Sequence, residues 1–146
     1  VMARLVAGGV TLRDQVNKRF PKRDKSADGW IGDKAHQGRQ SDHNPDSRGI
    51  VHALDIDADF GPPGENYAQK LANQIVAYAA SGLPGSNRIK YVVYNDRIAS
   101  GTYEASKWKW RGSGYGHMHH IHVSFTTKGE NNAQKFPLPI LDTPKK

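Results

Sequence analysis

Cysteine is absent from the 146 residues of the chain. This absence excludes disulfide bonds, thiolate metal sites and every mechanism that uses a cysteine nucleophile. No stretch approaches the roughly 20 consecutive apolar residues that cross a bilayer, and the apolar stretch within residues 1–15 is too short for a secretory signal. We therefore expect neither a membrane span nor an export signal.

Acidic residues are also scarce, because 14 Asp and Glu stand against 21 Lys and Arg and leave a formal net charge of +7. Such an excess attracts a polyanion, which can be nucleic acid, an anionic membrane or an anionic cell wall. Nucleic-acid chemistry has further requirements, and the chain contains neither a glycine-rich phosphate cradle nor the spacing of an HNH nuclease motif. We therefore expect no nucleic-acid partner.

The length suits one domain, and the sequence pattern predicts both helices and strands. A Thr-x-x-Asp capping box at Thr11 and Asp14 predicts a helix that begins at Thr11 and ends before Pro21. A second helix is predicted over residues 66–81, with Gly82 at its end. Three runs have the alternation or the β-branched composition of strands: residues 51–57, 89–94 and 120–125. Between the first helix and the first strand, residues 22–49 form a predicted loop, and loops of this length in small domains are usually functional.

Histidine is concentrated in one segment, since four of the seven His residues fall within six positions: His117, His119, His120 and His122. Alternation along a strand puts His120 and His122 on the same face, about 6 to 7 Å apart. One imidazole can then bind a metal ion while the other transfers protons.

Two further segments carry side chains that can bind a metal. His43 lies in the long loop, and alternation along residues 51–57 puts Asp55 and Asp57 on one face of a strand. An aspartate is disfavoured in an apolar strand, so Asp55 is there either to bind a metal or to pair with a Lys or Arg. Zinc in a hydrolase takes three N or O ligands and leaves a position for water, and His, Asp and His from separate elements supply such a set.

The pattern predicts an α+β domain over residues 1–127. We expect a small antiparallel sheet that carries a single zinc site, with helices packed on the opposite face. Asn95-Asp96 predicts a hairpin turn after the strand at residues 89–94. Residues 128–146 are polar and interrupted by proline, so they form either an irregular wrap or a linker to a further module.

The segment Ser41-Asp42-His43, with Gly49 and Ala53-Leu54-Asp55 after it, resembles the Ser-x-His and Gly-x-x-x-Ala-x-Asp motifs of the D-alanyl-D-alanine carboxypeptidase family of zinc peptidases. His120-Ile121-His122 resembles the closing His-x-His motif of that family, which includes phage L-alanyl-D-glutamate endopeptidases. Its metal site and fold resemble those of lysostaphin-type enzymes and hedgehog domains. The wider segments DGWIGDKAHQGRQSDHNPD and HMHHIHVSF are similar to peptidase modules of endolysins from phages of actinobacteria. The resemblance covers about residues 12–125.

The resemblance implies that His43, Asp55 and His122 bind zinc and that His120 lies nearest the scissile bond. The interval from His43 to the aspartate is longer than in most of the family, which indicates an insertion in residues 44–50 and leaves Asp57 as an alternative ligand. Many members have Glu or Asp as general base three residues before the last His, whereas this chain has His119 there. The general base is therefore His120 or His119.

Three further residues are candidates for contact with the substrate. Arg39 can hold a substrate carboxylate or polarise its carbonyl group, although an exposed loop cation is an equal alternative. Ser41 is expected to form hydrogen bonds within its loop or the site, because no Gly-x-Ser-x-Gly elbow marks it as a nucleophile. His117 can stabilise an oxyanion, and a solvated turn residue is the alternative.

These observations predict a monomeric zinc peptidase that cleaves stem or cross-link peptides of peptidoglycan, as the catalytic module of an endolysin. The bond is L-Ala to D-Glu or D-Ala to diaminopimelate. Such an enzyme is made in the host cytoplasm and reaches the wall through a holin lesion, and the positive charge suits an anionic wall. The alternatives are a non-catalytic zinc-containing recognition domain and a metal-dependent nuclease.

Overall fold

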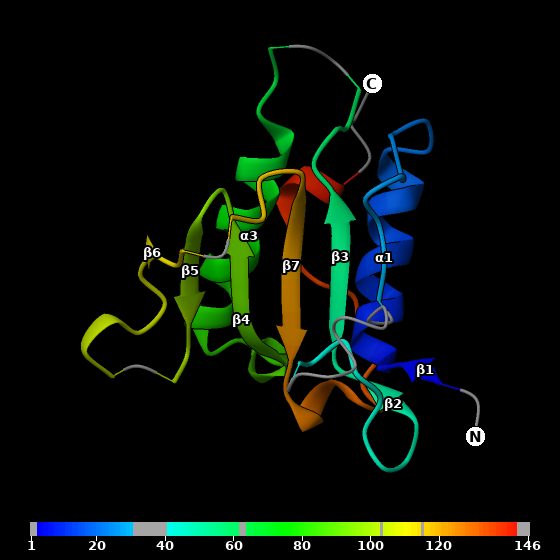
Figure 1. Ribbon diagram of the computed structural model, residues 1–146, viewed down its shortest axis with the longest axis vertical. Coiled ribbons are helices and arrows are strands. Elements are labelled where there is room, and N and C mark those ends of the chain that lie inside the picture. The colour runs from blue at the N-terminus through cyan, green and yellow to red at the C-terminus, as the bar shows by residue number, and fades with distance from the viewer. Residues whose placement is uncertain (1–2, 31–40, 62–63, 103, 115, 143–146) are drawn as a thin grey trace.

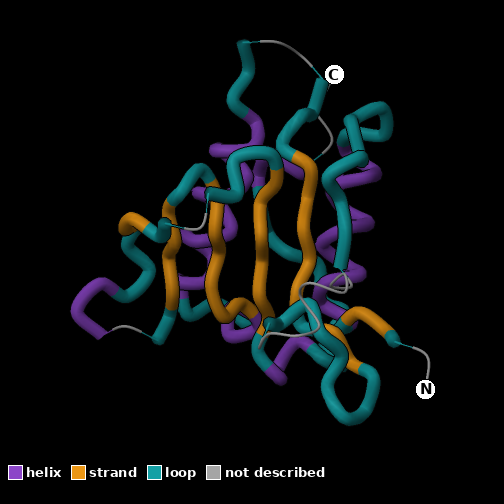
Figure 2. Tube along the Cα trace, viewed as in Figure 1, coloured by secondary structure: helices purple, strands orange, loops and turns teal. Residues whose placement is uncertain are grey.

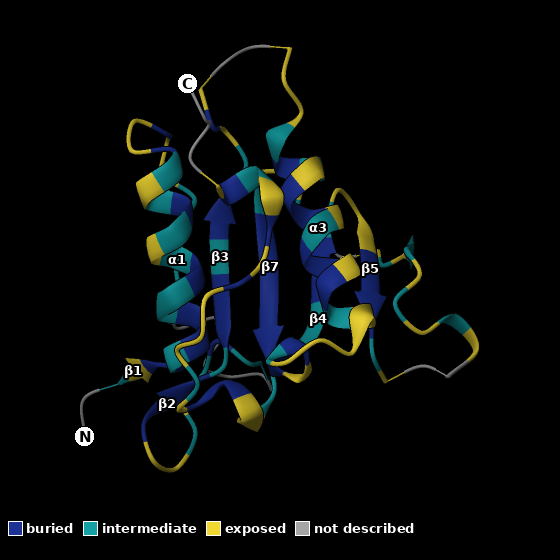
Figure 3. Ribbon diagram, turned by 180° about the vertical axis from the view of Figure 1, so that it is seen from behind, coloured by how far each residue is buried: buried dark blue, intermediate teal, exposed yellow. Residues whose placement is uncertain are grey.

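The computed structural model describes residues 3–30, 41–61, 64–102, 104–114 and 116–142. These residues form an α+β fold in two layers, with helices α1 (Ala7–Arg19) and α3 (Tyr67–Ser81) behind an antiparallel sheet (Figure 1). Seen from behind, α1 lies beside β3 and α3 lies over β4, and both helices turn their exposed residues outward (Figure 3). The predicted fold class and the packing of helices on one face of the sheet are confirmed.

The main sheet has the strand order β3-β7-β4-β5-β6, with antiparallel neighbours throughout. Its strands are β3 (Ala53–Asp57), β4 (Ile89–Tyr94), β5 (Arg97–Ser100), β6 (Arg111–Gly112) and β7 (His120–Phe125). Short 3-10 helices lie in the connections: η1 (Ser86–Arg88), η2 (Glu104–Ser106), η3 (Thr127–Gly129) and η4 (Pro139–Leu141) (Figure 2). The strands at residues 89–94 and 120–125 have the predicted bounds.

The predicted strand over residues 51–57 is two strands. β2 (Ile50–Val51) pairs in parallel with β1 (Arg4–Leu5) in a separate small sheet, and β3 starts after His52. His52 stands between the two because its backbone N–H donates to Asp42 O at 3.1 Å, outside both ladders. This bond closes the loop that carries His43.

The two helices begin for different reasons. The Asn66 side chain caps α3 by accepting from Gln69 N at 3.4 Å, and Gly82 ends the helix with a φ of 75°. The prediction that α1 begins at Thr11 is wrong, since the helix starts at Ala7 and Thr11 Oγ1 donates to Ala133 O at 2.9 Å. The first turn of α1 is instead satisfied by tertiary contact, because Ala7 N donates to Glu130 O at 3.1 Å.

The core lies between the sheet and the helices. The back face of β3 and β7 supplies Leu54, Ile56, Ile121 and Val123, all of them buried against α1 or α3. Alternation directs His122 to the front face, as predicted, and Ser124 with it, yet both are buried there. His43, from the loop before β2, packs against the His122 ring, and His122 in turn contacts Ser124, so this part of the front of the sheet is a second, polar interior.

The described part of residues 128–146 is an irregular wrap that belongs to the domain. Phe136, Leu138 and Leu141 are buried in the same core, and the fully buried Arg88 holds the segment by donating to Gln134 O at 2.5 Å. The Arg88 guanidinium also lies 3.8 Å from the centre of the Phe136 ring. The core therefore extends beyond residue 127.

No helix in the described part of the chain is long and apolar enough to cross a membrane.

If the wrap is part of the core, Phe136→Ala lowers the free energy of unfolding by about 3 to 5 kcal/mol, because it leaves a cavity between Arg88 and Tyr78. Urea denaturation followed by circular dichroism measures the change. The neighbouring exposed Lys135 is the control, and Lys135→Ala changes the same quantity by no more than about 0.5 kcal/mol. Equal stability of the two variants would show that the wrap contributes nothing to the fold.

Candidate metal centre

The candidate metal centre lies on the front of the sheet, where β3 and β7 pair. The register sets Asp55 opposite His122, and side chains of directly paired residues share one face. His43 reaches them from the covering loop, and its ring meets that of His122 edge to face with centroids 4.9 Å apart. Three segments that are distant in the sequence thus meet at one point, as the sequence predicts.

The three potential ligand atoms form a nearly equilateral triangle. His43 Nε2 lies 3.2 Å from Asp55 Oδ1 and 3.1 Å from His122 Nδ1, and His122 Nδ1 lies 3.1 Å from Asp55 Oδ1. Ligands about 2.0–2.1 Å from a tetrahedral zinc ion are roughly 3.3 Å from one another. The triangle fits such an ion, and His43, Asp55 and His122 form a group that could hold a metal.

In each of the two histidines, the ring nitrogen that points away from the triangle, here called the outward nitrogen, has its own hydrogen-bond partner. His43 Nδ1 lies 2.9 Å from Trp30 O, and because a carbonyl oxygen only accepts, Nδ1 donates and Nε2 keeps the lone pair of the neutral ring. His122 Nε2 lies 2.8 Å from the hydroxyl of the buried Ser124, which can accept and leave the lone pair on Nδ1. Tyr91 stacks on the His122 ring at 5.4 Å. Such outer partners orient metal-binding histidines.

The charges around the triangle also suit a cation. Burial raises the pKa of Asp55, but hydrogen bonds and charge from His122 and His43 lower it by more, so its pKa lies well below its usual range. For His43, burial lowers the pKa, and the hydrogen bond and charge of Asp55 raise it by more. Asp55 is therefore ionised at neutral pH, and a metal and a proton compete for the same nitrogen of His43.

Asp57, the alternative ligand, is used in another way. Its carboxylate accepts from Ala27 N and Asp59 N, each at 2.8 Å, and from Ser26 Oγ at 3.4 Å. These donors anchor the loop beside β3 and occupy the lone pairs that a metal would need. The structure therefore places Asp55 in the triangle and Asp57 in a loop anchor.

Buried Arg23 fixes the segment that delivers Trp30. Its guanidinium donates to Asn17 Oδ1 of α1 at 2.8 Å and to both carboxylate oxygens of Asp28. Asp28 in turn accepts from Asp57 N at 2.6 Å, and Gly29 forms a bridge to Asp55 with a backbone bond of 2.7 Å. The carbonyl of Trp30 is thereby held against the outer edge of β3, in reach of His43.

His120 and His117 border the triangle. His120 Nε2 lies 3.7 Å from Asp55 Oδ2 and 2.7 Å from His117 Nδ1, so the two imidazoles share a hydrogen bond. Burial, followed by the charges of His122 and His120, lowers the pKa of His117 to about 4, and burial also lowers the pKa of His120. Both rings are neutral at pH 7. His119 is exposed and lies in a separate hollow with Asp24 and Met118, so the structure does not bring it to the triangle.

A backbone clamp holds His117 in place. The hairpin turn is confirmed, and both Asn95 and Asp96 have positive φ values, 53° and 61°, as a type I′ turn requires. Asn95 N donates to His117 O at 3.0 Å, and Asp96 Oδ1 accepts from Gly116 N at 3.0 Å. His117 itself has a φ of 52°, a conformation that non-glycine residues rarely adopt. The turn after β4 thus positions the residue that contacts His120.

The two other predicted substrate residues have different outcomes. Ser41 Oγ accepts from His43 N at 3.2 Å, so the serine shapes the loop that presents the ligand. Its neighbour Asp42 pairs with Lys90 at 2.9 Å and ties the same loop to β4. Arg39 lies outside the described residues.

A second group that could hold a metal consists of Asp46, His52 and Glu130. Arg48 already contacts both Glu130 oxygens, at 3.0 and 2.7 Å, and Asp46 Oδ2 at 2.9 Å, and His52 Nε2 lies 2.6 Å from Glu130 Oε2. A bidentate guanidinium supplies the positive charge that this group would otherwise take from an ion. We interpret it as an ion-pair network that ties residues 44–50 to the C-terminal wrap.

Comparison of the chain with protein-family models, curated protein sequences and solved structures finds no match.

We predict close to one zinc ion per chain, measured by atomic emission after purification without chelator. His122→Ala abolishes the binding, since it removes a ligand. Ser124→Ala weakens it roughly 10- to 100-fold, because the outer partner of His122 is lost. The matched control is the buried Ser100 of β5, and Ser100→Ala leaves the affinity unchanged. Full zinc retention in His122→Ala would contradict the assignment.

The clamp on His117 predicts that Asp96→Gly increases amide hydrogen exchange at Gly116 roughly three- to tenfold, measured by NMR, because it removes the acceptor and keeps the turn conformation. Asp96→Asn retains an acceptor and tolerates positive φ, so exchange stays near the wild-type rate. Asn95→Gly, whose side chain is not part of the clamp, is the control. An increase of the same size in all three variants would mean that the turn, and not the carboxylate, holds the loop.

Proposed function

We propose that this chain is a zinc-dependent peptidase that hydrolyses an amide bond in the peptides of bacterial peptidoglycan. The observation that carries the proposal is the triangle of His43, Asp55 and His122, in which ligand atoms are 3.1–3.2 Å apart and the outward nitrogens of both histidines are held by Trp30 O and Ser124 Oγ. Three N and O ligands in this arrangement are typical of catalytic zinc, which keeps a fourth position for water.

Zinc bound by this set supplies a Lewis acid that activates water and polarises a carbonyl group. The residues beside it supply the proton transfer. His120 Nε2, within 3.7 Å of Asp55 Oδ2, takes a proton from the attacking water and later gives it to the leaving amine. In the resting structure this nitrogen shares a hydrogen bond with His117 Nδ1 at 2.7 Å, so the attacking water replaces His117 as its partner before the transfer, and His117 then borders the water. His119 has no part in this scheme.

Two further observations support a cell-wall substrate. The motifs around His43, Asp55 and His122 resemble those of the D-alanyl-D-alanine carboxypeptidase family and of endolysin peptidase modules. As part of the same proposal, we assign to the chain the fold type that this family shares with hedgehog domains and lysostaphin-type enzymes. The net charge of +7 favours an anionic polymer such as the wall. Within the wall, we favour the L-Ala to D-Glu bond over the D-Ala to diaminopimelate cross-link, because phage members of that family more often cleave the former.

Digestion of purified diaminopimelate-type cell walls tests the proposal directly. The chain should release free amino groups without new reducing sugar ends, and a chelator should stop the release until zinc is added back. Mass spectrometry of the released fragments then identifies the bond. New reducing ends would contradict a peptidase. Intact walls in the presence of stoichiometric zinc would favour the non-catalytic recognition domain, and nicking of plasmid DNA would favour the nuclease.

For the proton-transfer residue, we predict that His120→Ala retains zinc and folds but loses on the order of 10²- to 10⁴-fold in kcat on wall peptides, the usual contribution of a positioned general acid–base. The adjacent exposed His119 is the matched control, and His119→Ala stays near the wild-type rate. The opposite outcome, with an active His120→Ala and an inactive His119→Ala, would assign the base to His119.

A further inference from the structure

A groove runs along the end of the sheet where β4 and β5 meet the loop of His43. Its first part has a volume of about 300 Å³ and its second part about 410 Å³. Both parts are lined by Lys90, Thr102 and Thr126, so they are adjacent. The second part reaches Asp42, the neighbour of the metal-binding candidate His43. The groove therefore borders the loop that presents His43.

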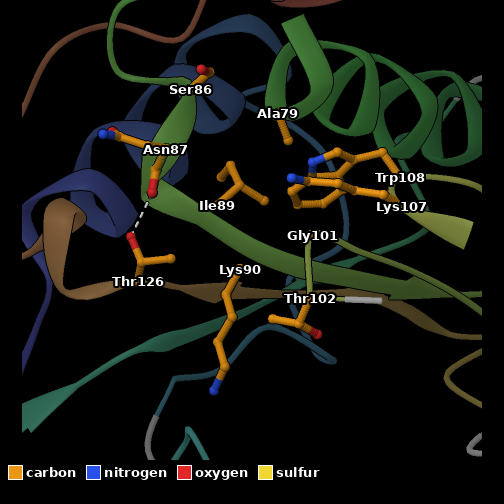
Figure 4. Close-up of a pocket in the computed structure, with 10 residues that line it drawn as sticks. All are labelled: Ala79, Ser86, Asn87, Ile89, Lys90, Gly101, Thr102, Lys107, Trp108 and Thr126. Carbon is orange, nitrogen blue, oxygen red and sulfur yellow. Dashed lines mark hydrogen bonds between the residues drawn. The ribbon is translucent and has the colours of Figure 1, made fainter. Parts of the chain in front are cut away.

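The far end of the groove is formed by Trp108 and Lys107, whose side chains lie side by side in Figure 4. Two features place the indole there. Trp108 has a φ of 57°, a strained value for a tryptophan, and a Cβ at Gly101 would lie only 2.7 Å from Trp108 Cζ2. Gly101 therefore leaves room for the indole, which packs against the core at this end of the groove and exposes part of its ring there.

The charges of the groove select the ligand. Lys90 is neutralised by Asp42 at 2.9 Å, whereas Lys107 is exposed and forms no ion pair within the described part of the chain. Asp42 is the only carboxylate among the described residues that line the two parts. An unpaired ammonium group beside an aromatic ring and Ile89 fits a ligand with a carboxylate next to an apolar part.

We infer that this groove binds the acidic segment of the peptide substrate, with a carboxylate at Lys107 and apolar atoms against Trp108. The inference rests on the proposed function, because it takes the chain to be a peptidase whose substrate peptide carries carboxylate groups. The groove acts in substrate binding and not in the chemical step. Its lysine therefore affects KM and leaves kcat unchanged.

Binding is tested with the full-length chain, isotopically labelled for NMR, and the peptide acetyl-Ala-Glu-Glu-Ala-amide as probe. We expect shifts at the amides of Gly101 and Thr102 and at the Trp108 indole. The glutamine counterpart of the probe and the Lys107→Met variant each weaken binding by about three- to tenfold. Higher ionic strength weakens it as well. Lys109 is two residues after Lys107 in the chain and does not line the groove. Lys109→Met therefore tests whether the loss of any nearby positive charge weakens binding, and we expect it to leave the affinity unchanged.

Four results would overturn the inference: shifts on another face, equal affinity for the glutamine peptide, equal losses in Lys107→Met and Lys109→Met, or tighter binding of a thymidine tetranucleotide in the groove. The titration is repeated with a chelator present, so that its outcome does not depend on zinc or catalysis. Binding without wall hydrolysis would leave the groove in place and contradict the proposed function. Wall hydrolysis with an unchanged KM in Lys107→Met would contradict the groove alone.

Discussion

The antiparallel register of β3 against β7 determines where the groups of the candidate site that lie on the sheet are placed. It sets Asp55 opposite His122 and Ala53 opposite Ser124. A slip of β7 by one residue would turn His122 and Ser124 to the other face and bury the imidazole against the helices. The apolar side chains of Ile121 and Val123 oppose such a slip, because they are fully buried behind the sheet. Hydrophobic burial on one face thus selects the polar arrangement on the other.

The third member of the triangle depends on interactions outside the sheet. His43 lies in a loop, and its position comes from ion pairs on both sides of it. Arg23 and Asp28 fix the segment that presents Trp30 O, and Arg48 and Glu130 fix the segment that follows His43. Most of these groups are buried or half-buried, where charged hydrogen bonds are stronger than at the surface. The loop can therefore present a ligand although it has little regular secondary structure.

Periodicity and residue chemistry sufficed to predict the strands at residues 89–94 and 120–125 and the α3 helix, and they brought His43, His122 and either Asp55 or Asp57 to one site, whereas the choice of Asp55 followed from the resemblance to zinc peptidases. These features depend on local pattern, and a strand with His-x-His can show only one face to a metal. The start of α1 could not be predicted, because Glu130, distant in the sequence, caps it. The role of Asp57 likewise follows from loop contacts with Ala27. Ser124 shares the predicted face of His122 and could have been predicted as its partner, whereas Tyr91 and Asp96 have no local pattern that connects them with the site.

β7 lies between β3 and β4, although it is the last strand of the sheet in chain order. During synthesis, β3 and β4 therefore have no partner between them until residues 120–125 have emerged. Until then the apolar back of β3 remains uncovered on one side. His43 and Asp55 also lack His122, the third member of the triangle. Closure of the sheet and assembly of the site are then a single late event, with contacts of high sequence separation that make folding slow. Because the ligands are far apart in the sequence, the unfolded chain has little affinity for the ion, and a metal would stabilise only the completed fold.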